Sequence, residues 1–514
     1  MPHCRYYPIA LILLLYLAIQ TICFQEAGIV GEVAIGWSSQ PNVIINTHPI
    51  TLDDGHEWGV LLARETRPRE SLVLWGLSIP LAINSYTSAI PDWPSALIYS
   101  VFRSVEGVQY FHILCGAGLL LLCIYLFPDK IGLLMATLLA CDWTFLIYKQ
   151  LLGGTELCLQ LASIGLLWSL YRKQSWGTAL FCIFLGLQAK ITFAFLVIPC
   201  LLTIVLFPIP MKRTHIKKGI MFGSLLLLPI LITNIHHLQI ENTIQSHDTI
   251  DMQWQRIVHV FSEQSQNAIR EQHENIWLWA LHPLSFYERI YDLPQTLHWV
   301  FGIRMLGWIL VFGLWIRSFY TQNKSLAFLF CSSLLFIGLG PKDMHHFSMM
   351  VPIWAFWLGN TVHNITHPLA WISPFVCSGI ILCGYTDTVF SQIPIPSFSK
   401  TKQEQLISIL DHHNVHKLVT MDYELYGLFE TQHTKRDIYH GWGAISRRRY
   451  HTLPHLIEQA QNGHILLVTA SMPMRYNLNP TNEQLHEAAQ KKHLRIQTVE
   501  ETSELRLFHV SSAE

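Results

Sequence analysis

The sequence contains little charge for its length. Asp, Glu, Lys and Arg make up 13% of the 514 residues, while hydrophobic residues make up 51%. An ordinary soluble domain carries about 25% charged residues. The formal net charge is −1, so the chain has no overall basic field that would attract nucleic acid. These values exclude a disordered chain, a coiled coil and an ordinary soluble enzyme, because much of the surface must avoid water.

Paired cysteines and nucleotide-binding motifs are also missing. The 11 cysteines include no C-x-x-C pair, most lie within apolar runs, and none follows Cys383. This pattern is typical of small apolar side chains packed between helices rather than of a disulfide framework. The absence of the G-x-x-x-x-G-K-[ST], G-x-G-x-x-G and H-E-x-x-H motifs disfavours a nucleotide-driven pump. The 27 histidines are scattered and lack the spacing of a zinc module.

Long apolar runs are abundant and predict a multi-pass membrane protein. The first run, residues 9–24, could be a cleaved signal peptide, but no small-x-small cleavage site follows Cys23, which favours an uncleaved transmembrane helix. The longest run contains Lys190 and is predicted to break there into two short helices. In all we expect about eleven transmembrane helices. The runs after the first are 108–127, 131–148, 155–171, 177–207, 219–234, 299–318, 326–340, 347–364 and 370–386.

Short basic connections between these runs predict the orientation of the chain. If the N-terminus is cytoplasmic, all of these connections fall on the cytoplasmic side, as the positive-inside rule requires. They are residues 128–130, 171–173, 212–218 and 317–324. Two large loops, residues 25–107 and 235–298, then face the other compartment. Residues 71–90 are moderately apolar but contain Pro80 and Asn84, so we expect them to lie along the membrane surface rather than cross it.

The composition changes near residue 400, where helical and strand-like stretches begin to alternate. This alternation predicts a small α/β domain. Helices are expected at 401–413, 453–462 and 481–493, and strands at 417–421, 464–469 and 494–499. The predicted fold is therefore an α-helical multi-pass membrane domain, residues 1–389, followed by a soluble α/β domain, residues 390–514. The second domain is expected on the extracytoplasmic (periplasmic) side of the inner membrane.

The first outer loop holds the densest group of titratable residues, Leu52-Asp53-Asp54-Gly55-His56-Glu57-Trp58. Asp53 and Asp54 could supply a general base and a second group that orients it or binds a metal ion. A general base must be ionised and must reach a hydroxyl in a site partly shielded from water, as a loop beside a membrane provides. The alternative is a solvated turn in which one of the two aspartates caps a helix.

Two charged residues fall within or beside apolar runs. Glu156 lies near the outer end of its run, where the cost of an ionised carboxylate is lower than at the bilayer centre. Lys190 lies at the predicted helix break, near the outer face, and a buried ammonium needs an anionic partner or water. A phosphate would suit it. The alternative is a lysine whose ammonium reaches the interface while its stem stays in the apolar region.

A further outer connection reads Pro341-Lys342-Asp343-Met344-His345-His346. Lys342, His345 and His346 could bind an anion. The two histidines could instead bind a metal ion, although adjacent residues seldom hold one without help from elsewhere. A simple interfacial turn is the third interpretation.

The order of these features resembles the GT-C class of membrane glycosyltransferases, and within it the bacterial protein O-mannosyltransferase and aminoarabinose-transferase superfamily. The class has one helix, then a large outer loop with an acidic motif, which corresponds here to residues 52–58. Two stretches, Ile79 to Ala89 and Pro94 to Phe102, are similar to its proline-containing segment before the second span. Residues 153–190 are similar to its paired helices. There are three departures: Asp-Asp in place of the usual Asp-Glu, Lys149-Gln150-Leu151 where relatives often carry Arg before the second acidic residue, and Gln188-Ala189 in place of the usual Leu-Thr before Lys190.

The resemblance implies a role for each matching residue. Asp53 would be the catalytic base and Asp54 would support it, while Glu156 would take the second acidic position and Lys190 would lie near the lipid phosphate. Tyr86 would belong to the substrate-binding residues with these two. The implied reaction transfers a sugar from a polyprenyl phosphate, with inversion at the anomeric carbon. Some members of the class use a divalent metal ion and others do not, and the acidic residues here permit one.

The sequence therefore predicts a membrane glycosyltransferase that acts at the outer face of the inner membrane. Its partners would be the polyprenyl-phosphate sugar donor and a lipid, polysaccharide or protein acceptor, with no nucleic acid. A transporter or lipid flippase is the alternative, but it would need polar groups that continue through the bilayer centre, and often repeated halves. An inactive relative that acts as a scaffold through its C-terminal domain is a third candidate.

Overall fold

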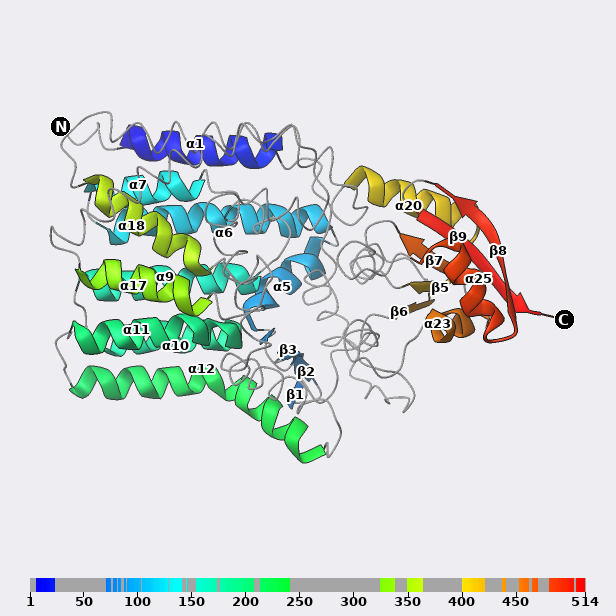
Figure 1. The fold of residues 1–514 in the computed structure, drawn as a ribbon. Helices are drawn as coiled ribbons and strands as arrows, with labels where there is room; N and C mark the ends of the chain where they lie inside the picture. Colours follow the sequence, from blue (N-terminus) through cyan, green and yellow to red (C-terminus); the bar gives the residue numbers. More distant parts are fainter. Residues whose placement is uncertain are drawn as a thin grey trace.

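The structure is a computed structural model, in which helices form one end of the molecule and a small sheet forms the other (Figure 1). The residues it describes are 6–23, 71–74, 77–80, 82–84, 87–88, 90–102, 104–127, 129–140, 145, 154–172, 176–207, 213–240, 324–337, 349–363, 400–420, 437–440, 453–461, 465–469, 480–502 and 505–513. The structural account below concerns these residues.

The helical end is a bundle of long apolar helices that lie side by side (Figure 1). They overlap the apolar runs from 9–24 to 219–234, together with 326–340 and 347–364, while the runs 299–318 and 370–386 lie outside the described residues. That these helices cross a membrane stays a prediction. The helices are α1 (Tyr6–Cys23), α6 (Val105–Leu126), α7 (Asp129–Ala140), α9 (Gly154–Tyr171), α10 (Trp176–Ala189), α11 (Ala194–Leu206), α12 (Arg213–Ile240), α17 (Lys324–Ile337) and α18 (Val351–His363).

One helical segment of the described chain, Glu106–Leu126, is both long and apolar enough to cross a bilayer by itself. Shorter apolar helices, of 10–17 residues, lie at Tyr7–Thr21, Lys130–Ala140, Gly177–Ala189 and Ala194–Leu206. Aromatic side chains fill the space between the helices: the rings of Phe127 and Phe356 lie 4.7 Å apart, and Tyr171 packs on Phe356 at 5.3 Å. Side chains from eight of the described helices thus share one apolar core: α1, α6, α7, α9, α10, α11, α17 and α18.

The predicted break at Lys190 is confirmed. α10 ends at Ala189, a single 3₁₀ turn, η4 (Ile191–Phe193), follows, and α11 begins at Ala194. The Lys190 N–H still donates to the Gly186 carbonyl, as in a helix, and the Lys190 carbonyl accepts from the N–H of Phe193 in the tighter turn. The charged side chain therefore leaves the chain at a corner between two helices rather than from the middle of one.

Short strands form within residues 71–90, the segment predicted to lie along the membrane surface, and that position stays a prediction. β1 (Ser71–Leu74) pairs antiparallel with β2 (Leu77–Pro80), and β3 (Ala82–Asn84) pairs with β4 (Thr87–Ser88). A 3₁₀ turn, η3 (Ile90–Asp92), then leads into α5 (Trp93–Phe102), which is the proline-containing segment noted in the sequence. Pro94 suits the first turn of α5, because an N–H there has no helical acceptor.

The C-terminal end contains a mixed five-stranded sheet in the order β6-β5-β7-β9-β8. β5 runs parallel to β6 and β7, whereas β9 runs antiparallel to β7 and β8. The predicted helices and strands all form, and two further strands, β6 and β9, add to them. The elements are α20 (Lys400–His412), β5 (Lys417–Thr420), β6 (Asp437–His440), α23 (Leu453–Ala460), β7 (Ile465–Thr469), α25 (Asn482–Gln490), β8 (Leu494–Glu501) and β9 (Leu505–Ser512).

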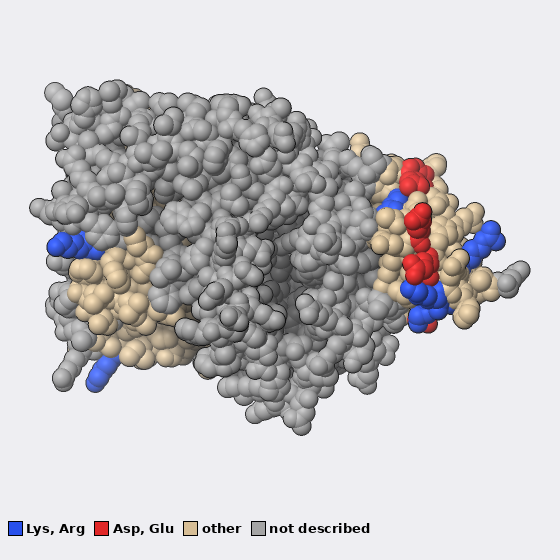
Figure 2. Space-filling view, viewed as in Figure 1, with Lys and Arg blue, Asp and Glu red and all other residues tan. Residues whose placement is uncertain are grey.

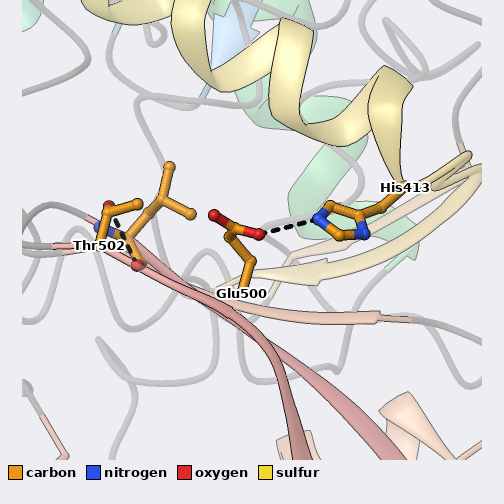
Figure 3. Close-up of polar contacts among 4 residues, drawn as sticks. His413, Glu500 and Thr502 are labelled. Atoms are coloured by element: carbon orange, nitrogen blue, oxygen red, sulfur yellow. Dashed lines mark hydrogen bonds and ion pairs between the residues drawn. The ribbon is translucent and has the colours of Figure 1, made fainter.

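Helices cover both faces of this sheet, because neighbouring strand residues point to opposite sides. Leu418 and Leu467 pack with α20 in one apolar cluster. Val419 and Leu466 pack with α23 and α25 in another. The end of α20 is also tied to the sheet, because the His413 Nε2 lies 3.0 Å from Glu500 Oε2 on β8 (Figure 3). An α/β architecture is therefore present in the C-terminal region, while its boundary at residue 390 lies outside the described residues.

The C-terminal region rests on the end of the bundle that carries α5. The apolar cluster under α20 also contains Ala96 and Tyr99 of α5 and Val108 of α6. The surfaces of the two parts differ in charge. On the face shown in Figure 2, the described acidic side chains lie on the C-terminal region, and the described surface of the bundle is mostly uncharged.

Candidate functional site: a buried ion pair at the covered end of the bundle

Glu156 and Lys190, which the sequence singled out separately, form a buried ion pair. The Lys190 Nζ lies 3.8 Å from Glu156 Oε1, and their side chains are only 7% and 4% exposed, respectively. Glu156 lies in the first turn of α9, and Lys190 lies at the corner between α10 and η4. A helix N-terminus favours a negative charge, so the position of Glu156 partly offsets the cost of burying it.

A second buried carboxyl group, Asp92, lies beside this pair. Its Oδ1 accepts a hydrogen bond of 2.8 Å from the N–H of Gly154, the first residue of α9. Asp92 is completely buried. Burial raises its pKa, the hydrogen bond from Gly154 opposes the rise, and the negative charge of Glu156 adds to it, so that the pKa reaches about 8. At neutral pH the neutral acid is therefore the main form.

The contact between Asp92 and α9 requires a glycine at position 154. A Cβ atom there would overlap the carbonyl oxygen of Pro91 and would lie 2.8 Å from Asp92 Oδ1. Only a residue without a side chain lets η3 approach the start of α9 this closely.

Sequence reasoning missed Asp92. In Pro91-Asp92-Trp93-Pro94 the aspartate reads as the polar residue of an exposed turn before a helix. Two prolines so close together are typical of a fixed turn, but nothing in the sequence indicates that α9 covers it.

Two more short hydrogen bonds join the segment from β4 to α5 to the helices of the bundle. The Gln188 side-chain amide donates to Ser88 Oγ at 2.6 Å, and the Ser95 hydroxyl lies 2.7 Å from His112 Nε2. Both contacts are buried. The segment from β4 to α5 is therefore fixed to α10, α9 and α6 around the ion pair.

Several buried polar atoms at this end have no hydrogen-bond partner among the described residues. They are Asp92 Oδ2 and the hydroxyl oxygens of Thr155 and Thr192. Thr155 precedes Glu156, and Thr192 follows Lys190 by two residues. Leaving a buried hydroxyl unsatisfied costs about 1–3 kcal/mol, so a group of such atoms beside a buried ion pair marks a place where a polar ligand can bind.

The connectivity places this site away from the basic connections. Ser88 and Asp92 contact the end of α10 and the start of α9, so these helix ends lie under β4 and η3. Arg172 therefore lies at the other end of α9. Lys130 shares that end, because it begins α7 after α6 has run away from α5. This arrangement agrees with the orientation predicted from charge, in which the site is on the outer side.

The other predicted site residues lie outside the described residues. They are Asp53, Asp54, Tyr86, Lys342, His345 and His346. Their roles, and any contact of theirs with the ion pair, stay predictions. Within the described ranges, no three His, Cys, Asp or Glu side chains are grouped as metal ligands would be.

No family model and no curated protein matches the sequence. A comparison with solved structures, however, finds two crystal structures of ArnT from Cupriavidus metallidurans, one bound to undecaprenyl phosphate and one in the apo state. The TM-scores are 0.51 and 0.50, at 8% sequence identity. The first alignment covers 97% of this chain and 97% of ArnT, and the second covers 98% of each.

The chain has the fold of ArnT. The resemblance to the aminoarabinose-transferase superfamily, first noted on residues 1–210, is thus confirmed at the level of the fold and extends over almost the whole length. The helical class with a small sheet is likewise confirmed. The number of transmembrane helices stays a prediction.

Proposed function

We propose that the protein is a membrane glycosyltransferase of the inner membrane. It would take a sugar from a polyprenyl-phosphate donor at the outer face and transfer it to a lipid, polysaccharide or protein acceptor. The observation that carries this proposal is the buried pair of Glu156 and Lys190, which lies at the helix ends that contact β4 and η3. The chain shares its fold with ArnT, a protein crystallised with undecaprenyl phosphate.

The geometry of the pair suits a phosphate. A direct charge-assisted hydrogen bond between an ammonium and a carboxylate is about 2.7–2.9 Å long. The 3.8 Å separation of Lys190 and Glu156 is longer, so the ammonium keeps donor capacity for a second anion. The hydroxyls of Thr155 and Thr192 would supply further hydrogen bonds to phosphate oxygens.

In the reaction, an acceptor hydroxyl would attack the anomeric carbon from the face opposite the phosphate. The new C–O bond forms as the bond from the anomeric carbon to the phosphate oxygen breaks, which gives inversion. Asp53 would take the acceptor proton, with Asp54 supporting it. The leaving polyprenyl phosphate carries away the bonding electrons, and Lys190 would stabilise the charge that develops on it.

The remaining candidate residues would serve the sugar and the acceptor. Tyr86 precedes β4, whose Ser88 contacts α10 just before Lys190, so it is placed in sequence to reach the donor. Lys342, His345 and His346 would hold an anionic part of the donor or acceptor. The C-terminal α/β region would lie on the periplasmic side, because it rests on the same end of the bundle as α5.

The direct test is sugar transfer from a polyprenyl-phosphate donor by the purified full-length protein. We expect Asp53→Asn to lower the rate about 100-fold or more while the protein inserts and folds, since general-base catalysis contributes factors of this size. Lys190→Ala should raise the donor KM more than it lowers kcat. Glu404→Gln, an exposed change on α20, serves as the control.

Envelope glycolipids compared by mass spectrometry with and without the protein would identify the product. Normal turnover by Asp53→Asn would dismiss the assignment of the base. Lipid movement across vesicles without any sugar transfer would instead favour a flippase.

A further inference from the structure

The outer segment from Ser88 to Asp92 contacts the two helix ends that carry the ion pair, and it does so at matching positions. Ser88 accepts from Gln188, two residues before Lys190. Asp92 accepts from Gly154, two residues before Glu156. One short piece of chain therefore contacts both α9 and α10, in each case two residues before a member of the ion pair.

These contacts are specific and tightly packed. The two hydrogen bonds are 2.6 and 2.8 Å long and both are buried, so water does not compete for them. Ser88 also accepts from the N–H of Ile90, which fixes the turn that leads to Asp92. The glycine at 154 lets this turn lie directly on α9.

We propose that residues 88–92 form a clamp that sets the separation of Glu156 and Lys190, and that Asp92 is its positioning residue for the donor phosphate. The phosphate in this inference rests on the proposed function, whereas the clamp rests on the contacts alone. Asp92 acts through α9 and Glu156, so it is not a catalytic residue.

The clamp gives a reason for a buried acid that forms no ion pair with the described residues. Oδ1 fixes the start of α9, while Oδ2 is buried with no hydrogen-bond partner among the described residues. Among the described residues, Glu156 and Cys158 of α9 interact electrostatically with Asp92. Lys190 pairs with that Glu156, and His112 of α6 contacts Ser95, three residues after Asp92. A neutral Asp92 leaves the attraction between Glu156 and Lys190 undisturbed, whereas an ionised one would repel Glu156.

The test combines a structural readout with a kinetic one on the full-length protein. In the first, a small amine-reactive reagent is applied and the modification of Lys190 is quantified by mass spectrometry. In the second, kcat and KM for the polyprenyl-phosphate sugar donor are measured separately. The variants are Asp92→Ala, Ser88→Ala and the conservative Asp92→Asn.

Ser169→Ala is the matched control, because it removes a buried hydroxyl from the far end of the same α9.

Asp92→Ala should increase Lys190 modification several-fold and raise the donor KM about 10- to 100-fold, with a smaller change in kcat, since misplacement by about 1 Å has effects of this size. Ser88→Ala should act in the same direction. Asp92→Asn keeps an oxygen that can accept from Gly154, so it should restore most of the donor affinity near pH 7. Ser169→Ala should change neither readout.

The outcomes separate this inference from the proposed function. If Asp92→Ala leaves both Lys190 modification and the donor KM at wild-type values, the clamp is wrong even if the protein transfers sugar. If Lys190 modification rises in Asp92→Ala but the wild type transfers no sugar, the clamp stands and the proposed function fails. If Asp92→Ala does not fold, unchanged readouts in Ser88→Ala would overturn the clamp.

Discussion

The two ends of the molecule use ion pairs in opposite ways. In the C-terminal region, Lys492 and Glu458 lie 2.8 Å apart, and so do Lys491 and Glu487, but all four side chains are at least 38% exposed. In the bundle, Glu156 and Lys190 are 3.8 Å apart and almost fully buried. The two shorter ion pairs thus lie at the surface, where an ion pair contributes least to stability.

This difference indicates that the buried pair, rather than the exposed pairs, serves a function other than stability. Exposed pairs contribute about 0–1 kcal/mol, because water and salt screen the charges. Burying two charges costs several kcal/mol per ion, and only excellent geometry recovers that cost. A long, buried pair with unsatisfied hydroxyls beside it is therefore hard to explain as a stabilising feature and easier to explain as part of an anion-binding site.

The largest expected effect comes from breaking the buried pair on one side. Lys190→Met should destabilise the protein by about 3–5 kcal/mol, because it leaves the Glu156 carboxylate buried without its lysine partner. The double variant Glu156→Leu/Lys190→Met should regain stability close to the wild type, since apolar side chains of similar volume often replace a buried pair without loss. Thermal unfolding in detergent measures both, and equal losses in the two variants would show that the pair itself stabilises the fold.

The next effect concerns Asp92 and pH. Its folded-state pKa of about 8 lies above the ordinary value of 3.8, so between these two pH values the folded state binds more protons than the unfolded state. Stability of the wild type should therefore fall as pH rises from about 4 to about 8, by an amount on the order of a few kcal/mol. Asp92→Asn removes this dependence.

The Tm of Asp92→Asn relative to the wild type should consequently increase between pH 5 and pH 9. A constant difference across this range would mean that Asp92 is ionised in the folded protein.

A smaller effect is expected at Gly154. Gly154→Ala places a methyl group against Pro91, and overpacking of this kind typically costs about 1–3 kcal/mol. Gly118→Ala is the matched control, because nothing lies within 4 Å of a Cβ at that position in α6 and alanine favours helix more than glycine. Comparison of the two Tm values checks the close approach of η3 to α9. Equal behaviour of the two variants would contradict it.

The smallest effect is expected at the exposed pairs. The pKa of Glu487 is lowered by its hydrogen bond from Lys491 and then by the charge of the same lysine. Because Glu487 is fully exposed, Glu487→Gln should leave the Tm unchanged within error at low and high salt. A clear loss of stability at low salt would mean that the contrast between the two ends is smaller than the geometry indicates.

Much of the fold could be predicted because the sequence signals are local. A charge in a long apolar run marks a break, and α10 does end just before Lys190. Alternating apolar and polar stretches gave most of the C-terminal helices and strands. β9 was missed although Leu505, Leu507 and Val510 show a partial alternation, and β6, with four residues, is too short to give a pattern.

The site was harder to predict because it depends on contacts between distant segments. Glu156 and Lys190 were each chosen for their charge, but their contact follows from how α9 packs against α10. Asp92 was missed because its burial is caused by the start of α9, which lies far away in the sequence. A single sequence contains no signal for such a contact.

The central claim is that Lys190, paired with Glu156, binds the phosphate of a polyprenyl phosphate, and binding measured without catalysis tests it most directly. Undecaprenyl phosphate and the uncharged alcohol undecaprenol would be titrated into the wild type and into the double variant Glu156→Leu/Lys190→Met, each shown to be folded by its Tm. We expect the wild type to prefer the phosphate and the double variant to lose at least about tenfold in phosphate affinity, which corresponds to about 1.4 kcal/mol, while undecaprenol binding stays the same. Equal affinity of the two proteins for undecaprenyl phosphate would contradict the claim.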